Sequence, residues 1–357
     1  MYVTKYKDKY RAFERYKVGD TWRKVSVVMD RNTPQERRKA AAILAEKTER
    51  PTTGVTYSRL VKDYINYQKA VFKPSTWMRN EASLNRLKDT FEDAKLDKMT
   101  AGFISSRLLR KTQNPGTYNE YLKRLKSLFH WAYRNDYIST PACVDKIKPL
   151  KDTPVAEKVA DKFLETEELK KVIESAPDYY APIFEFLALS GLRIGELIAL
   201  NDTDVTDVEI IVNKTYVHQT GGISTPKTES STRRVHIQPE LKPCIQKIRR
   251  NTLIYSVSAG SRTPYFVINQ TGGMLSYVTT NNAFKRTCER VLKSKLTVHA
   301  LRHTHVALMA EKGIDLKVIA RRLGHSSSKI TEDIYYHVTE KQREKDNAAI
   351  DAVRIFG

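Results

Sequence analysis

Cysteine is scarce in this 357-residue chain, which has only Cys143, Cys244 and Cys288. The number is odd, the spacings are wide and no CxxC pair occurs, so the sequence indicates neither a zinc site nor a disulfide framework. Glycine and proline are also few, at 14 and 13 residues, which excludes a fibrous or low-complexity chain. We therefore expect the three cysteines to be small apolar residues in a reducing compartment.

Long apolar runs are missing as well. The longest one, Pro182–Leu189, is interrupted by Glu185 and is far too short to span a membrane. The first ten residues are polar and lysine-rich, without the apolar region of a signal peptide. These absences predict a cytoplasmic protein that has no membrane partner.

Acidic residues are in short supply. Against 62 lysines and arginines there are 41 aspartates and glutamates, so the net charge is +21. Such an excess does not assist folding, and it indicates an acidic partner such as nucleic acid. The length of the chain predicts two or three domains.

The first domain is expected at residues 1–54. Its segment Lys24–Met29 is rich in β-branched residues and predicts a strand. Thr33 and Glu36 have the spacing of a capping box, which predicts a helix to about residue 47. A small sheet with one helix should result, followed by a linker at residues 51–54.

The second domain is expected at residues 55–150 and is all-helical, because its apolar residues recur at helical spacing. Helices should start near Lys73 and near Pro115. The polar face of the latter helix is basic: Lys123, Arg124, Lys126 and Arg134. A solvated charged face would give the same pattern, but in so basic a chain we favour phosphate contact.

The third domain is expected at residues 151–357, after a polar linker. Its first helix should be capped by Thr166, strands are indicated in Val205–Val217 and Arg233–Ile237, and helices resume at Tyr277. This domain is therefore mainly helical with a small antiparallel sheet. The predicted fold class for the whole chain is multidomain α+β.

Two basic residues occupy positions that suit chemistry on an anion. Arg193 interrupts the apolar string LSGLRIGEL, although an arginine that only pairs with Glu196 would give the same pattern. Lys227 lies in the string TPKT, within a polar turn between two expected strands. An exposed loop lysine is the ordinary interpretation of that position.

Histidines and tyrosines follow near the C-terminus. His299 and Arg302 of HALRHTH are three residues apart, so they share a helix face and can reach one phosphate. Metal binding by His299 and His303 is disfavoured, because no HExxH glutamate and no nearby cysteine accompany them. His325 lies in LGHSS, and Tyr335 lies in IYYHV, where tyrosines are also compatible with a core position.

In their order along the chain, these strings resemble the tyrosine recombinase (phage integrase) family. With RRV after TPKT, they cover residues 190–338, and the string FLETEEL at Phe163–Leu169 is similar to the start of that family's catalytic domain. The resemblance implies an arm-type DNA-binding domain at residues 1–54, a core-site-binding domain at residues 55–150 and a catalytic domain at residues 151–357.

The resemblance implies a site-specific recombinase of the type found in phages and conjugative transposons, which integrates or excises a mobile element. Its partners would be double-stranded DNA with core and arm-type sites, three further copies of the chain in a tetramer on DNA, an excisionase and a host DNA-bending protein. No cofactor and no metal are expected. A type IB topoisomerase and an inactive DNA-binding regulator remain alternative interpretations.

The chemistry suits the residue types. Fixed guanidinium groups such as Arg193 and Arg302 stabilise charge on phosphate oxygens, at about 3 kcal/mol for each donor. Tyr335 is expected to attack, with His299 as base or hydrogen-bond acceptor. Lys227 is expected to protonate the leaving 5′ oxygen. These roles are also the ones that the family resemblance implies.

His325 completes the expected site. His325 should donate to the phosphate or position the tyrosine. Ile330, Ile334 and Val338 define an apolar helix stripe at spacing four, with Tyr335 beside it and Tyr336 nearly opposite. The family pattern likewise favours Tyr335 as nucleophile.

Overall fold

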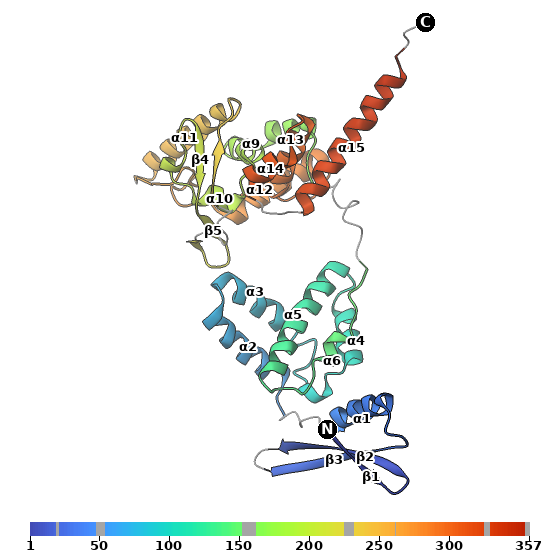
Figure 1. Ribbon diagram of the computed structural model, residues 1–357. Helices are drawn as coiled ribbons and strands as arrows, with labels where there is room; N and C mark the ends of the chain where they lie inside the picture. Colours follow the sequence, from blue (N-terminus) through green and yellow to red (C-terminus); the bar gives the residue numbers. More distant parts are fainter. Residues whose placement is uncertain are drawn as a thin grey trace. The chain divides into compact units, whose positions relative to one another are not determined.

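The computed structural model describes residues 1–18, 21–47, 54–151, 162–224, 232–260, 262–324 and 329–353. Contacts between residues divide the chain into two units, Met1–Asp152 and Thr153–Gly357 (Figure 1). Lys227 and His325 lie outside the described residues, so no structural statement is made about them. Within the described residues, no helix has both the length and the apolar character needed to cross a membrane.

Three antiparallel strands and one helix form the N-terminal part: β1 (Tyr2–Tyr6), β2 (Lys9–Val18), β3 (Thr21–Met29) and α1 (Pro34–Lys47). The hydroxyl of Thr33 accepts a hydrogen bond from the Glu36 N–H at 3.3 Å, which confirms the predicted start of α1. Ala40 and Leu44 of α1 are buried against the sheet residues Ala12 and Met29. One face of the sheet is thereby covered.

The other face of this sheet combines aromatic and basic side chains, because successive strand residues point to opposite sides. The residues on it include Tyr2, Tyr6, Arg11, Phe13 and Lys24. The Arg11 guanidinium lies 3.4 Å from the centre of the Tyr6 ring, and the Lys24 ammonium lies 3.8 Å from that of Phe13. Cation–π contacts of this kind hold the positive charges on the sheet surface.

A second cluster of buried apolar residues belongs to a group of helices: α2 (Tyr57–Val71), α3 (Pro74–Asn85), η1 (Leu96–Lys98), α4 (Ala101–Lys111), α5 (Pro115–Arg134) and α6 (Ala142–Asp145). The predicted starts near Lys73 and Pro115 are confirmed. Helix α4 lies in the region predicted to be all-helical, but its start was not predicted, because Gly102 and two serines lower its helix propensity. Burial of Ile104 and Leu108 stabilises it instead.

The basic strip of α5 is not uniformly exposed. Arg124 donates hydrogen bonds to the side chains of Asn80 and Glu120, so its charge is engaged within the helical group. Lys123, Lys126 and Arg134 line a cavity of about 680 Å³ together with aromatic side chains of α2 and α5. These three are the basic residues of the strip that border an open space.

The second unit is mainly helical. Its helices are α8 (Thr166–Ser175), α9 (Ala181–Ser190), α10 (Ile194–Ala199), η2 (Asp202–Asp204), α11 (Leu241–Ser258), α12 (Tyr277–Leu292), α13 (Ala300–Glu311), α14 (Leu316–Leu323) and α15 (Lys329–Asp351). Its strands are β4 (Glu209–Val212), β5 (Thr215–Val217), β6 (Gly222–Ser224) and β7 (Arg233–His236). β4 pairs with β7 and β5 with β6, both antiparallel. The predicted α+β class is confirmed.

Two details of this unit differ from the prediction. The cap of α8 is Glu165, one residue before the expected Thr166, because the carboxylate of Glu168 accepts from the Glu165 N–H at 2.9 Å. Helix α11 was not predicted. It is held by Leu241, Cys244 and Ile245, which are buried in the unit's large apolar cluster.

Candidate active site

A sharp turn between two buried helices presents Arg193. Helix α9 ends at Ser190, and Gly191 follows in the left-handed conformation with a φ of 70°. A Cβ atom on Gly191 would lie 2.6 Å from Cδ2 of His305, so only glycine fits here. The next helix, α10, starts at Ile194, which puts Arg193 directly before it.

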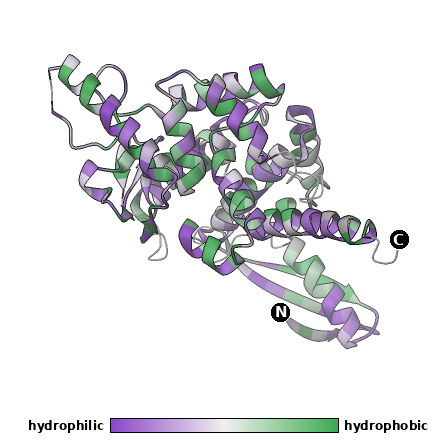
Figure 2. Cartoon of the chain, turned by 90° about the horizontal axis from the view of Figure 1, so that it is seen from above, coloured by the Kyte–Doolittle hydropathy of each residue, from purple (hydrophilic) through white to green (hydrophobic). Residues whose placement is uncertain are grey.

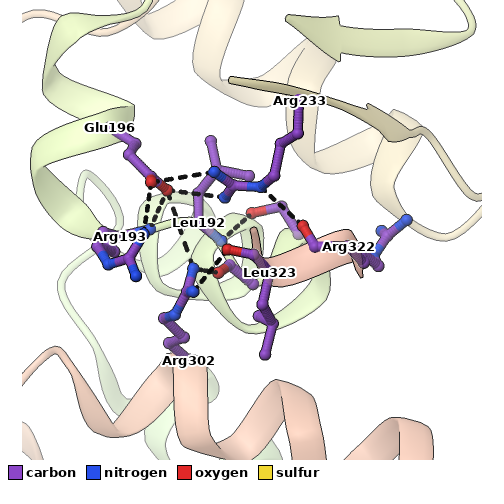
Figure 3. A network of polar contacts seen from close by, with 9 residues as sticks. Leu192, Arg193, Glu196, Arg233, Arg302, Arg322 and Leu323 are labelled. Carbon is purple, nitrogen blue, oxygen red and sulfur yellow. Dashed lines mark hydrogen bonds and ion pairs between the residues drawn. The ribbon is translucent and has the colours of Figure 1, made fainter. Parts of the chain in front are cut away.

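Glu196 of α10 gathers arginines from three elements (Figure 3). It is only 4% exposed. Its carboxylate accepts from the backbone N–H of Arg193 at 2.8 Å and from Nη1 of the same residue at 2.9 Å. Arg233 of β7 donates to both carboxylate oxygens, at 3.1 and 2.9 Å. Nη1 of Arg302, on α13, lies 3.9 Å from Oε2.

This group has an excess of positive charge. Burial alone raises the pKa of Glu196, but the hydrogen bonds and charge of Arg233, and then the charges of Arg302 and Arg193, lower it to about 2. The carboxylate is therefore ionised at neutral pH. Three guanidinium cations around one carboxylate anion leave a formal charge of +2, which suits the binding of an anion.

Arg302 is almost completely buried, at 2% exposed. Its Nη1 donates to the carbonyl of Gly191 and its Nη2 donates to the carbonyl of Leu323, both at 2.7 Å. Burial, followed by the charge of Arg193, lowers the pKa of Arg302 to about 9, so the side chain is still charged at neutral pH. The alternative interpretation, in which Arg193 pairs with Glu196, is also correct. Because Arg302 lies near the same carboxylate, this ion pair holds Arg193 close to Arg302.

His299 lies directly before α13, at the end that carries Arg302. The residue is exposed at the surface of its unit. Partial desolvation of the ring by the surrounding protein lowers the pKa of His299, and the positive charges of Arg302 and Arg193 lower it further. A neutral ring can accept a proton or a hydrogen bond. The rings of His299 and His303 lie edge to face, 4.8 Å between centres, and no three metal-ligating side chains gather within the described residues.

Tyr335 and Tyr336 occupy different sides of α15. Ile334 and Val338 are buried in an apolar cluster with residues of α13 and α14, and Tyr335 packs half-buried against it. Tyr336 is 60% exposed. The predicted placement of the two tyrosines is therefore confirmed, but Ile330 is 39% exposed and does not belong to the buried stripe as predicted, because it lies in the first turn of α15. Their rings lie edge to face, 5.8 Å between centres.

Three residues of this region escaped the sequence interpretation. Arg233 was noted only as part of the string RRV, and Arg322 and His305 were given no part in the site. Arg233 donates to the carbonyl of Arg322 at 2.7 Å, and the Nε of Arg322 donates to Nε2 of His305 at 3.2 Å. No local spacing signals these contacts, because their partners lie far apart in the sequence.

The comparison with protein families decides the identity of the chain. A family model described as the phage integrase family matches residues 162–342, which is slightly more than half of the chain. The chain belongs to the phage integrase family. This recombinase is 30% identical over 363 residues to the prophage ps2 probable integrase of Lactococcus lactis subsp. lactis (strain IL1403), and the alignment covers 94% of this chain and 95% of that relative.

Solved structures have the same fold. The recombinase resembles the Tn1549 transposon integrase in complex with transposon right end DNA, with a TM-score of 0.65, 20% identity and coverage of 81% of this chain and 99% of that one. It also resembles a lambda integrase tetramer bound to a Holliday junction, with a TM-score of 0.62, 17% identity and 92% coverage of each chain. The expected family, that of site-specific tyrosine recombinases, is thus confirmed, and the protein is an enzyme.

Proposed function

We propose that six side chains of this recombinase cleave and rejoin DNA: Arg193, Lys227, His299, Arg302, His325 and Tyr335. The observation that carries the proposal is the pairing of Arg193 and Arg302 around one buried carboxylate, with an excess of positive charge. Fixed guanidinium groups donate to the non-bridging oxygens of a phosphodiester, where negative charge grows in the transition state. These two residues therefore bind the scissile phosphate.

The cleavage step exchanges one phosphate ester for another. The phenol oxygen of Tyr335 bonds to phosphorus as its proton passes to His299, whose lowered pKa keeps the ring ready to accept it. The bond from phosphorus to the 5′ oxygen breaks, and Lys227 protonates that oxygen so that it leaves as a hydroxyl. His325 donates a hydrogen bond to the phosphate. The product is a 3′-phosphotyrosine.

Rejoining follows the same path in reverse. The 5′ hydroxyl of a second strand attacks the phosphotyrosine, gives its proton to Lys227 and displaces the Tyr335 phenolate, which takes the proton back from His299. The energy of the phosphate ester is retained throughout, so no nucleotide is hydrolysed. Exchange between two DNA sites integrates or excises a mobile element.

A suicide DNA substrate tests the nucleophile. A nick placed just 3′ of the scissile phosphate lets the 5′-hydroxyl fragment diffuse away, so the covalent complex accumulates. Tyr335→Phe should bind DNA normally and form no complex, because it lacks only the phenol oxygen. Tyr336→Phe, the matched control, should form it. Mapping of the modified peptide identifies the tyrosine directly, and an adduct on Tyr336 would overturn the assignment.

The three expected domains divide the DNA contacts between them. Residues 1–54 bind arm-type sites, which the basic and aromatic face of the N-terminal sheet supports, since Arg11 and Lys24 lie on it. Residues 55–150 bind the core site, which the open basic strip of α5 supports. Residues 151–357 are the catalytic domain. Recombination takes place in the bacterial cytoplasm, where the DNA lies.

Assembly joins four copies of the chain on DNA. The likeness to a lambda integrase tetramer bound to a Holliday junction supports this stoichiometry. Most of α15 is hydrophilic (Figure 2). Ile350 near its end and Val353 just beyond it are nevertheless 67% and 57% exposed. This apolar end docks on a neighbouring subunit. An excisionase and a host DNA-bending protein complete the assembly.

A further inference from the structure

Arg233 makes three side-chain hydrogen bonds at the centre of the arginine group. It is the first residue of β7, and its side chain is 6% exposed. Nη1 and Nη2 donate to the two oxygens of Glu196 at 3.1 and 2.9 Å, and Nε donates to the carbonyl of Arg322 at 2.7 Å. All three nitrogens of the guanidinium are thus engaged with protein groups.

The contacts of Arg233 affect how strongly the carboxylate of Glu196 attracts Arg193 and Arg302. Because Arg233 donates to both carboxylate oxygens, it neutralises most of the charge that Glu196 presents. Arg302 lies as far as 3.9 Å from that carboxylate. Without Arg233, the carboxylate would be shared between Arg193 and Arg302 alone, and the formal charge of the group would fall from +2 to +1. The two arginines would then turn their donors toward Glu196.

Arg233 and Arg302 also hold the same helix end. α14 ends at Leu323, and the last carbonyls of a helix have no partner within it. Arg233 donates to the carbonyl of Arg322, and Arg302 donates to that of Leu323 (Figure 3). Consecutive carbonyls of one helix end therefore set the spacing between the two guanidinium groups, which come from β7 and α13.

We propose that Arg233 is a positioning residue for DNA cleavage. By binding both oxygens of Glu196 and the end of α14, it sets the geometry and the net charge with which Arg193 and Arg302 meet the scissile phosphate. It does not touch the DNA. This inference rests on the proposed assignment of Arg193 and Arg302 as the residues that bind the phosphate.

Two substrates separate this role from a purely structural one. One is an ordinary suicide substrate, and the other has a methylphosphonate at the scissile position, which replaces one charged oxygen by a methyl group. Arg233→Met should slow cleavage of the ordinary substrate about 100-fold, the size of effect seen when one preorganised donor is lost. On the neutral substrate its defect relative to the native enzyme should shrink to less than about tenfold, because less charge needs stabilisation.

The ratio of the two rates comes from one protein preparation, so a partly unfolded variant does not distort it. Arg233→Lys keeps the charge but cannot donate to both oxygens at once, and it should be intermediate on the ordinary substrate. Arg234→Met is the matched control, since Arg234 is exposed and pairs only with the partly buried Glu209 among the contacts described for it. It should cleave both substrates at the native rate.

Arg193→Met, tested in parallel, distinguishes the failure of this inference from that of the site assignment. Its defect should also shrink on the neutral substrate. The positioning role of Arg233 is overturned if the defect of Arg193→Met shrinks and that of Arg233→Met does not. It is also overturned if Arg233→Met cleaves normally. In both cases the assignment of the phosphate-binding arginines stands. If neither defect shrinks, the assignment of the phosphate-binding arginines falls as well. Shrinkage for Arg233→Met alone would put Arg233 itself on the phosphate and overturn the inference.

Discussion

His305 is fully buried beside the arginine group and is held in one neutral form. Its Nδ1 lies 2.8 Å from the carbonyl oxygen of Ala188, and its Nε2 accepts from Nε of Arg322. The proton must therefore be on Nδ1. Burial, followed by the charge of Arg322, lowers the pKa of His305 to about 3. The neutral ring thus keeps Arg322, and through its carbonyl Arg233, in place.

Replacing His305 by glutamine should remove a pH dependence of stability. The pKa in the folded state is about 3 and the ordinary value is 6.5, so the contribution is complete above pH 6.5 and is lost as the pH falls toward 3. Across that window the native protein should lose about 1.4 kcal/mol of unfolding free energy per pH unit more than the variant. Urea unfolding at pH 7 and at pH 5 measures the difference.

The control for this experiment is His236→Gln, because the side chain of His236 is exposed and only its carbonyl accepts from Arg322. This variant should keep the native pH dependence. Equal pH dependence in His305→Gln and the native protein would show that His305 does not resist protonation in the folded state.

Lys227→Ala should slow cleavage by a factor of about 100 or more and leave DNA affinity nearly unchanged, as expected for a general acid. A substrate whose leaving 5′ oxygen is replaced by sulfur needs no protonation, so it should restore the rate of this variant. Lys214→Ala removes a lysine that pairs with Asp204 at 2.7 Å and serves as the control. Absence of rescue by sulfur would assign the proton transfer to another group.

At the scale of elements, α15 decides which tyrosine faces the protein. Successive residues of a helix are about 100° apart. Burial of Ile334 and Val338 in the cluster that includes residues of α13 and α14 therefore leaves Tyr335 at the edge of that contact and turns Tyr336 to solvent. The same packing ties the tyrosine to α13, the helix that carries Arg302.

The N-terminal sheet with α1 is expected to act as a separable element. Deletion of residues 1–54 should leave cleavage of a core-site suicide substrate intact and impair recombination between full sites. The double variant Arg11→Ala/Lys24→Ala should have the same effect through the uncovered sheet face, whereas Lys39→Ala on α1 should not. Normal recombination of full sites by the truncated protein would rule out arm binding by this element.

At the scale of the whole molecule, the end of α15 should govern assembly. Truncation at Asp346 removes Ile350 and Val353, whose side chains are 67% and 57% exposed. Cooperative binding of paired core sites should weaken more than binding of a single site. Gel-shift titrations with one-site and two-site DNA measure both affinities, and Ile350→Ser/Val353→Ser tests the apolar contact without shortening the helix. Equal loss on the two DNAs would contradict docking between subunits.

Several features of this recombinase were decided by the sequence alone, because their causes are local. The start of α1 follows from the hydrogen bond between Thr33 and Glu36, and the starts of α3 and α5 follow from proline at the first helical position. The order of the strings from LSGLRIGEL to IYYHV identified the family. The start of α4 and the whole of α11 escaped prediction because long-range burial, rather than local propensity, stabilises these helices.

Only the tertiary structure decided which charged groups meet. Glu196, Arg233, Arg302 and the carbonyl of Arg322 come from four elements, α10, β7, α13 and α14, which lie between residues 194 and 323. Sequence spacing carries no information on such distances, so Arg233 looked like any basic strand residue and His305 like any core histidine. Their partners become evident only in the folded protein, where the packing of α9, α10, α13 and α14 brings one carboxylate within reach of three guanidinium groups. The low polarity of that interior strengthens each of these contacts.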